Sequence, residues 1–219
     1  LLPHLSGTTD RPDRLTVLGS SLEGFKQDLA LIERFEESAE GRAAVENYEV
    51  RATTAELAPA KLKPLAVSSF DDCFVELPWN EALQEGIHLL AEQEVLGLKL
   101  RTGGVDPASV PSVASLSLAI QECCNLDLPF KVTAGLHRAL RSLDVHLGVE
   151  THGFLSLLAA AVLAGPHDLT RSEIEALLGE ADPQAFWFTD AGFGWRDYEA
   201  SLEEIADGRE VLRSIGTCS

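Results

Sequence analysis

The chain has 219 residues, and its 17 basic against 35 acidic residues leave a formal charge of −18. This length fits one large domain or two small ones and allows a sizeable core. So acidic a chain argues against nucleic acid or an anionic membrane surface as the main partner, because phosphate groups attract basic patches. A small phosphorylated ligand stays compatible with it, since such a ligand needs only a few local donors.

The four cysteines lie outside any CxxC or Cys/His spacing, so neither zinc nor another metal or cofactor is expected. The longest apolar run, 154–165, is too short to span a bilayer, and the first ten residues lack the features of a signal peptide. We therefore expect a cytoplasmic protein with free thiols and no membrane partner. Because it contains no Met, the chain is compatible with a fragment of a longer protein, in which case an early strand could be missing.

The first half of the chain alternates between strand and helix patterns. Residues 1–14 contain several Pro, Gly and polar residues and are expected to form a linker. A strand is predicted over 15–18, and 21–38 has its apolar residues at helical spacing. A second strand over 47–52 precedes a short helix over 53–64, which starts with candidate N-caps and is expected to be broken by its two prolines.

The alternation continues through the middle of the chain. A third strand is predicted over 73–78 and an amphipathic helix over 80–95. The fourth strand, 96–104, ends in Gly-Gly. A helix with Pro in its first turn follows over 111–125, and a fifth strand over 129–135.

At least four strand–helix alternations predict a parallel sheet with right-handed crossovers, either an open doubly wound sheet or a (β/α) barrel. No GxGxxG follows the first strand, so a dinucleotide-binding fold has no support. We favour an α/β fold of the (β/α) barrel (TIM-barrel) type, complete or missing strands, as a single domain over 15–219. Residues 150–219 are expected to be mostly helical, with a further strand and loop in the aromatic segment 185–195.

Polar side chains gather at the carboxyl ends of four predicted strands. They are Glu49, Arg51, Glu76, Lys99, Arg101, Lys131 and Thr133. A single charge at a strand end is usually just solvated, but charges inside a parallel sheet are costly unless they are paired or solvated. Residues two apart on a strand share a face, and ligands of α/β folds bind at this edge of the sheet. We therefore expect one polar pocket built from several strand ends.

Two small-residue loops continue these strands, RTGG at 101–104 and TAGLHR at 133–138. Such loops let backbone N–H groups point inward and can cradle a phosphate or carboxylate, although Gly after a strand often forms a simple turn. The candidate anion-binding residues are Arg51, Arg101, Thr102, Gly103, Gly104, Thr133, Ala134, Gly135 and His152.

Two histidines are candidates for different roles. His137 follows the second loop and could act as a general acid or base or hold an anion; an exposed loop histidine is the alternative. His152 opens the apolar segment HGFLSLLAAAVLA, where a buried, hydrogen-bonded core role is favoured over catalysis.

Lys99 and Lys131 lie 32 residues apart in the patterns K-x-x-T-G and K-x-x-A-G. Over about 40 residues this resembles the sixth and seventh strands of class I deoxyribose-phosphate aldolases. The resemblance implies that the first lysine forms a Schiff base, that the second lowers its pKa, and that the glycine loops hold the substrate phosphate. The chain departs from this family in Leu136-His137-Arg138, where Gly-Ile would follow, and offers Glu49 and Glu76 in place of the catalytic Asp.

A broader resemblance is to bacterial proteins without an assigned function that carry the motifs RTGG, PFKxTAGLH, HGF and G(S/T)CS. Here these motifs begin at Arg101, Pro129, His152 and Gly216. The resemblance spans most of the chain and implies that these segments belong to one site, without naming an activity.

A buried lysine beside a second cation has a depressed pKa and becomes a nucleophile toward carbonyls. The alternative is that Glu49 and Glu76 neutralise Lys99 and Lys131 as structural ion pairs. Our leading hypothesis is a lyase that acts on a small phosphorylated or carboxylated carbonyl metabolite, with Glu49, Glu76 or His137 moving protons. A non-catalytic protein that binds an anionic metabolite, or a proton-transfer isomerase, are the alternatives, and self-association is left open.

Overall fold

The computed structural model describes residues 4–93 and 96–216. Its main sheet contains six strands, all paired in parallel, in the order β1-β2-β3-β4-β5-β11. The strands of this sheet are β1 (Asp13–Leu18), β2 (Ala43–Arg51), β3 (Asp72–Glu76), β4 (Leu96–Arg101), β5 (Phe130–Thr133) and β11 (Leu212–Gly216).

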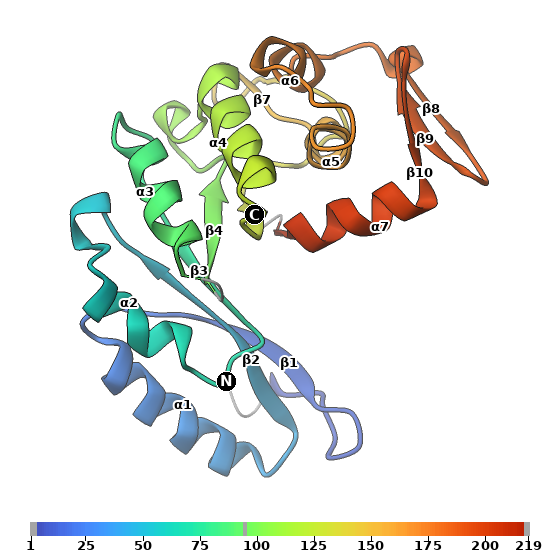
Figure 1. The fold of residues 1–219 in the computed structure, drawn as a ribbon. Coiled ribbons are helices and arrows are strands. Elements are labelled where there is room, and N and C mark those ends of the chain that lie inside the picture. The colour runs from blue at the N-terminus through green and yellow to red at the C-terminus, as the bar shows by residue number, and fades with distance from the viewer. Residues whose placement is uncertain (1–3, 94–95, 217–219) are drawn as a thin grey trace.

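Helices connect the first five strands. They are α1 (Phe25–Ala39), α2 (Pro59–Ala66), α3 (Leu83–Ala91) and α4 (Val113–Asn125). Figure 1 shows these helices along one face of the sheet, which curls into a half-barrel. The strand order follows the chain without the reversal of a doubly wound sheet. The predicted α/β fold with a parallel sheet is confirmed, but the described residues form a half-barrel and not a complete barrel.

The five predicted strands correspond to β1–β5, with shifts of a few residues at their ends. The short helix predicted over 53–64 is a 3₁₀ turn at Thr54–Glu56 followed by α2. Pro59 lies in the first turn of α2, where a missing N–H costs nothing, and the helix continues through Pro64 to Ala66. The prediction that Pro64 breaks this helix was therefore wrong.

The C-terminal part mixes helices with small antiparallel sheets. Its helices are α5 (Phe154–Leu163), α6 (Arg171–Leu178) and α7 (Leu202–Val211), and its short strands are β6 (Ser142–Asp144), β7 (Val149–Thr151), β8 (Phe186–Thr189), β9 (Gly192–Trp195) and β10 (Tyr198–Ser201). Strands β8 and β9 contain the strand expected in the aromatic segment 185–195. The hairpin β6–β7, strand β10 and the return of β11 to the main sheet were not predicted.

Capping boxes explain where two of these helices begin. The Thr170 hydroxyl accepts a hydrogen bond from the Glu173 backbone N–H at α6, and the Glu173 carboxylate accepts from the Thr170 N–H. Ser201 and Glu204 repeat this arrangement at α7. Each box satisfies backbone N–H groups that the first helical turn leaves without a partner.

The two faces of the main sheet differ in chemistry. Tyr48, Val75 and Leu98 belong to the hydrophobic core that the sheet shares with the helices. The residues that alternate with them, including Glu49 and Lys99, point to the opposite face. This opposite face is the concave side of the half-barrel, and it carries the predicted site.

Candidate active site

A row of four charged residues crosses the concave face. Arg51 on β2 pairs in register with Glu76 on β3, Glu76 with Lys99 on β4, and Lys99 with Lys131 on β5. Because paired residues of parallel strands project to the same side of a sheet, the four side chains stand next to one another. The sequence prediction that these strand ends form one polar site is consistent with this geometry.

Glu49 lies one row below, toward the amino ends of the strands, and joins the two lysines. Its Oε2 is 2.8 Å from Nζ of Lys99, and its Oε1 is 2.5 Å from Nζ of Lys131. Nζ of Lys99 is also 2.8 Å from Oε2 of Glu76, whose Oε1 lies 2.9 Å from Nε of Arg51. One carboxylate thus bridges two buried ammonium groups, and a second carboxylate connects Lys99 to the more exposed Arg51.

The buried carboxylates set the charge state of the site. Burial lowers the pKa of Lys99, but the hydrogen bonds and charges of Glu49 and Glu76 outweigh it, so that the pKa is raised overall. Burial raises the pKa of Glu49, and the hydrogen bonds from Lys131 and Lys99 reverse this effect and lower it. The expectation that a neighbouring cation depresses the pKa of this lysine was therefore wrong for Lys99 in the ligand-free protein.

An aromatic ring forms the floor beneath the lysines. Nζ of Lys131 lies 5.3 Å from the ring centroid of Phe74, within the range of a cation–π contact. The ring passes over Gly97, where a Cβ atom would lie 2.6 Å from it. Gly97 therefore makes room for Phe74, which sequence reasoning did not single out.

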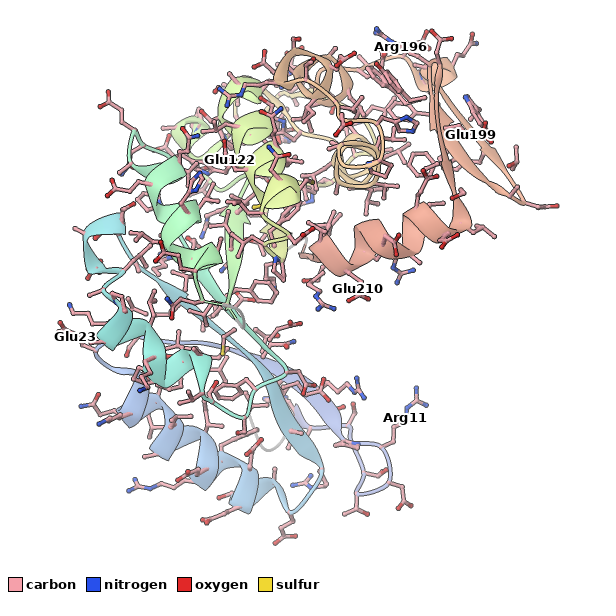
Figure 2. All side chains as sticks on the ribbon, viewed as in Figure 1. Arg11, Glu23, Glu122, Arg196, Glu199 and Glu210 are labelled. Carbon is pink, nitrogen blue, oxygen red and sulfur yellow. The ribbon has the colours of Figure 1, made fainter. Side chains whose placement is uncertain are left out.

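A pocket of about 640 Å³ opens above this floor. Its charged lining residues are Glu49, Arg51, Lys99, Arg101, Lys131, His137 and Asp144. Four Lys and Arg cations thus face two carboxylates, in a chain whose overall charge is −18. Acidic side chains such as Glu23, Glu199 and Glu210 lie on the outer surface instead (Figure 2). This local excess of positive charge favours an anionic ligand.

The two predicted anion loops meet at one wall of the pocket. A Cβ atom on Gly103 would lie 2.6 Å from Cα of Gly135, so the two backbones are in direct contact. The buried Thr102 hydroxyl donates a hydrogen bond to the Ala134 carbonyl at 2.7 Å. Ala134 (φ 68°) and Gly135 (φ 77°) both have a left-handed backbone conformation. Within the described residues, the backbone N–H groups of Gly103, Gly104 and Gly135 have no hydrogen-bond acceptor, as an anion cradle requires.

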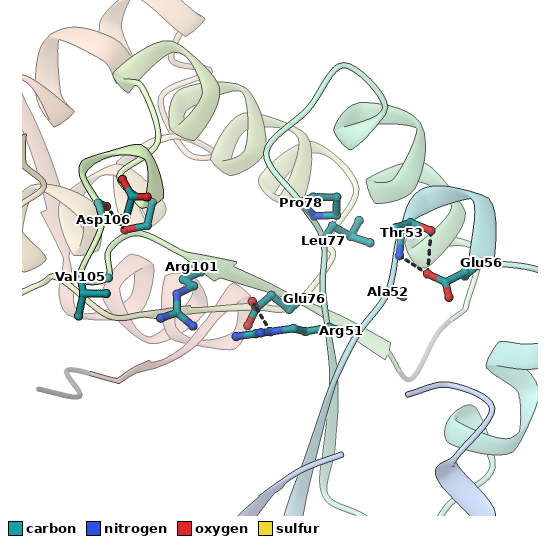
Figure 3. Close-up of a pocket in the computed structure, with 12 residues that line it drawn as sticks. Arg51, Ala52, Thr53, Glu56, Glu76, Leu77, Pro78, Arg101, Val105 and Asp106 are labelled. Carbon is teal, nitrogen blue, oxygen red and sulfur yellow. Dashed lines mark hydrogen bonds and ion pairs between the residues drawn. The ribbon is translucent and has the colours of Figure 1, made fainter. Parts of the chain in front are cut away.

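Arg51 and Arg101 line both this pocket and a second one at the ends of β2, β3 and β4, which Figure 3 shows. Nε of Arg51 is held by Glu76, and Nε of Arg101 donates to the Gly103 carbonyl at 3.0 Å. In the described part of the chain, the terminal amino groups of both guanidinium groups have no hydrogen-bond partner. Both side chains are thus oriented through Nε and keep their outer donors available for an anion.

The two candidate histidines lie in different surroundings. His137 is exposed and lines the pocket. His152 is 1% exposed, and its Nε2 contacts the Pro111 carbonyl at 2.8 Å. Burial is the main cause that lowers the pKa of His152, which keeps the ring neutral. The structure does not bring His152 to the pocket, so it gives no support to His152 as an anion-binding residue and agrees with the core role favoured from the sequence.

The hairpin β6–β7 supplies lining residues that sequence reasoning missed. Asp144, Leu147 and Thr151 come from this hairpin, and the Asp144 carboxylate accepts hydrogen bonds from the backbone N–H groups of His146 and Leu147. Asp144 before the turn and Gly148 at its end are turn signals that could have located the hairpin, but nothing in them indicates that the hairpin covers a pocket.

Comparison with known proteins gives no match to a family model, a curated protein or a solved structure. The resemblances drawn from the motifs therefore stay predictions, and residues 217–219 of the G(S/T)CS motif lie outside the described residues. Within the part that the structure describes, no helix is long and apolar enough to cross a membrane. The same residues contain no group of three or more His, Cys, Asp or Glu side chains that could hold a metal ion.

Replacing Glu49 by Gln should destabilise the protein by about 3 kcal/mol, because two buried lysines lose their shared counter-charge. Urea denaturation at pH 7 measures this change. The control is Glu23→Gln, which removes the exposed ion pair with Lys61 and should cost less than about 1 kcal/mol. Equal stability of both variants would contradict a structural role for the bridge.

The contribution of Glu49 to stability should also depend on pH. Its pKa in the folded protein is below the ordinary value of 4.5, so its stabilising effect is complete above pH 4.5 and is lost as the pH falls through the folded pKa. The difference in unfolding free energy between the wild type and Glu49→Gln should therefore shrink below pH 4.5. A difference that stays constant from pH 7 to pH 3 would refute this.

Gly103→Ala should destabilise the protein by about 1–3 kcal/mol, because the added Cβ atom overlaps the backbone of Gly135 and pushes the two loops apart. Thermal or urea unfolding measures the loss. Gly165→Ala is the matched control, since a Cβ atom there meets no heavy atom within 4 Å. If both variants were equally stable, the close contact between the loops would be wrong.

Proposed function

We propose that the protein is an enzyme that acts on a small phosphorylated or carboxylated carbonyl metabolite through a lysine Schiff base, as a lyase similar to class I aldolases. The observation that carries this proposal is the pair Lys99 and Lys131, buried side by side in register and sharing Glu49 at the floor of a pocket. Two primary amines beside a proton acceptor are the components that iminium chemistry needs.

The proposed roles follow from the positions of the side chains. Either lysine can attack a carbonyl carbon once it has passed a proton to a carboxylate. Glu49 touches both amines and is the nearest acceptor, while His137 at the pocket wall can exchange protons with a bound substrate. Of the two lysines, Glu76 contacts Lys99, and its carboxylate stabilises the protonated form of that side chain.

The acidic group of the substrate would bind at the loop wall. The N–H groups of Gly103, Gly104 and Gly135 are available there, and the Arg101 guanidinium lies beside the first loop. Backbone N–H groups and arginine together bind phosphate and carboxylate well. A small anionic metabolite fits this wall, and we place its reaction in the cytoplasm.

We also propose that the half-barrel is part of a (β/α) barrel. The strand order follows the chain, the connecting helices lie on one face, and the polar residues lie at the carboxyl ends of the strands. These are features of (β/α) barrels, whose active sites lie at this end. They agree with the resemblance of β4 and β5 to the lysine strands of deoxyribose-phosphate aldolases.

A second candidate function is favoured by the ion pairs themselves. The raised pKa of Lys99 keeps this side chain protonated in the ligand-free protein, with its hydrogen bonds to two carboxylates. A lysine that stays charged suits a protein that binds an anionic metabolite without reacting with it. It also suits an isomerase in which Glu49 or His137 transfers a proton while the lysines stabilise an enolate.

Borohydride trapping tests the proposal. The protein is incubated with aldehyde phosphates, keto phosphates and keto acids, reduced with sodium borohydride, and measured by intact mass and peptide mass spectrometry. We expect a stable adduct on Lys99 or Lys131 with at least one compound, and no adduct in the double variant Lys99→Arg, Lys131→Arg. Absence of any adduct, although the same compounds raise the melting temperature, would reject the Schiff base and favour the second candidate.

A further inference from the structure

We propose that Lys131 is the lysine that forms the Schiff base, that Glu49 accepts its proton, and that Lys99 is a positioning residue that holds Glu49. This inference rests on the proposed carbonyl chemistry of the site, and it reverses the roles that the aldolase resemblance implies for the two lysines.

The two lysines differ in the number of carboxylates they contact. Nζ of Lys99 lies 2.8 Å from an oxygen of Glu49 and 2.8 Å from an oxygen of Glu76, while among the residues that the structure describes Nζ of Lys131 has Glu49 as its carboxylate partner. Deprotonation of Lys99 therefore weakens two ion pairs, and deprotonation of Lys131 weakens one. The side chain with fewer partners is the easier one to convert into a neutral amine.

The charges that remain after proton transfer separate the two lysines further. If Lys131 gives its proton to Glu49, the cation of Lys99 still faces the carboxylate of Glu76. If Lys99 gives its proton to Glu49, Lys131 is left as a buried cation without a carboxylate partner among the described residues, which is costly.

Proton transfer from Lys99 to Glu76 is also disfavoured. Nε of Arg51 lies 2.9 Å from Oε1 of Glu76 and stabilises its charged form. Glu76 is thus held as a carboxylate from two sides, by Arg51 and by Lys99. Among these proton transfers, the one from Lys131 to Glu49 leaves no buried ammonium group without a carboxylate partner.

A neighbouring aromatic ring also favours Lys131 as the position of the iminium intermediate. The Phe74 ring beside Nζ favours a cation, and the iminium ion is again a cation at this position. The ring thus favours the charged lysine at the start and the charged intermediate afterwards.

Formation of the iminium ion on Lys131 uses proton transfers through Glu49 and releases one water molecule. Lys131 ammonium passes one proton to the Glu49 carboxylate, and its lone pair forms the C–N bond while the carbonyl π electrons move to oxygen. That oxygen takes the proton from Glu49 and becomes the hydroxyl group of a carbinolamine. Glu49 next takes the second proton from the nitrogen and passes it to the hydroxyl group. The hydroxyl group leaves as water, and the nitrogen lone pair forms the C=N bond of the iminium cation.

Several charged groups surround Lys131 and enter its pH dependence. They come from β2, β3, β4, the loop after β5 and the hairpin β6–β7, and they are Glu49, Arg51, Glu76, Lys99, Arg101, His137 and Asp144. Among the cations, Lys99 shares a carboxylate with Lys131 and is therefore expected to have the strongest influence on it.

The first test locates the borohydride adduct by peptide mass spectrometry in the wild type, Lys131→Arg and Lys99→Arg. We expect the adduct on Lys131 in the wild type, its loss in Lys131→Arg, and its retention in Lys99→Arg, where a cation still holds Glu49. An adduct on Lys99 would overturn this assignment and leave the proposed function intact. No adduct in the wild type with any carbonyl compound would overturn the proposed function itself.

The second test measures how adduct formation depends on pH in Lys99→Met, with Lys99→Arg as the conservative control. Removing the cation beside Lys131 should raise the pH of half-maximal adduct formation by about one unit, because Glu49 then pairs with Lys131 alone. Lys99→Arg should keep the wild-type midpoint. A lower adduct yield in Lys99→Met at every pH, without a shift of the midpoint, would overturn the positioning role of Lys99.

Discussion

The bridge that Glu49 forms between Lys99 and Lys131 is the interaction on which the concave face of this protein depends. Two ammonium groups that are each more than nine-tenths buried would be unstable side by side without a shared counter-charge. The parallel register of β4 and β5 places the lysines next to each other, and the offset of Glu49 by one row lets its two oxygens reach both. A shift of one strand by one residue would turn a lysine toward the hydrophobic core.

The sheet has an apolar face that packs against the helices and an opposite face that carries this network of charged residues. The helices and the apolar residues of the convex face form a continuous core, which can support charged residues at the other face. At the carboxyl edge, the loops after β4 and β5 add backbone donors, and Arg51 and Arg101 add guanidinium groups. In this strongly acidic protein, the lining of the pocket thus contains more Lys and Arg residues than carboxylates.

Much of the parallel sheet could be predicted from the sequence, because β3, β4 and β5 are short apolar runs that alternate with amphipathic helices. The same reasoning predicted that the polar residues at these strand ends lie near one another, since the carboxyl ends of neighbouring parallel strands meet at one edge. Strand β11 escaped prediction because it carries only two apolar residues and pairs across an irregular register. The hairpin with Asp144 escaped because turn signals do not tell which surface a hairpin covers.

The charge state of Lys99 could not be derived from the sequence. It depends on which carboxylates reach Nζ, and Glu49 and Glu76 reach it from two different strands. A count of neighbouring cations along the chain gives the wrong direction, because the carboxylates on β2 and β3 outweigh Lys131 in the fold. The role of His152 was anticipated because its position at the start of an apolar helix already indicated burial.

Lysine-selective ¹⁵N NMR of the ammonium groups tests the central claim most directly, namely that this buried lysine pair is a reaction site. In the ligand-free protein the account predicts slowly exchanging ammonium signals of Lys99 and Lys131, which Lys→Arg variants would assign. Addition of a reactive aldehyde or keto phosphate should remove the ammonium signal of Lys131 and leave that of Lys99. If both signals persist at saturating concentrations of carbonyl compounds that bind, the lysine pair is an ion-pair network for anion binding, and the account is contradicted.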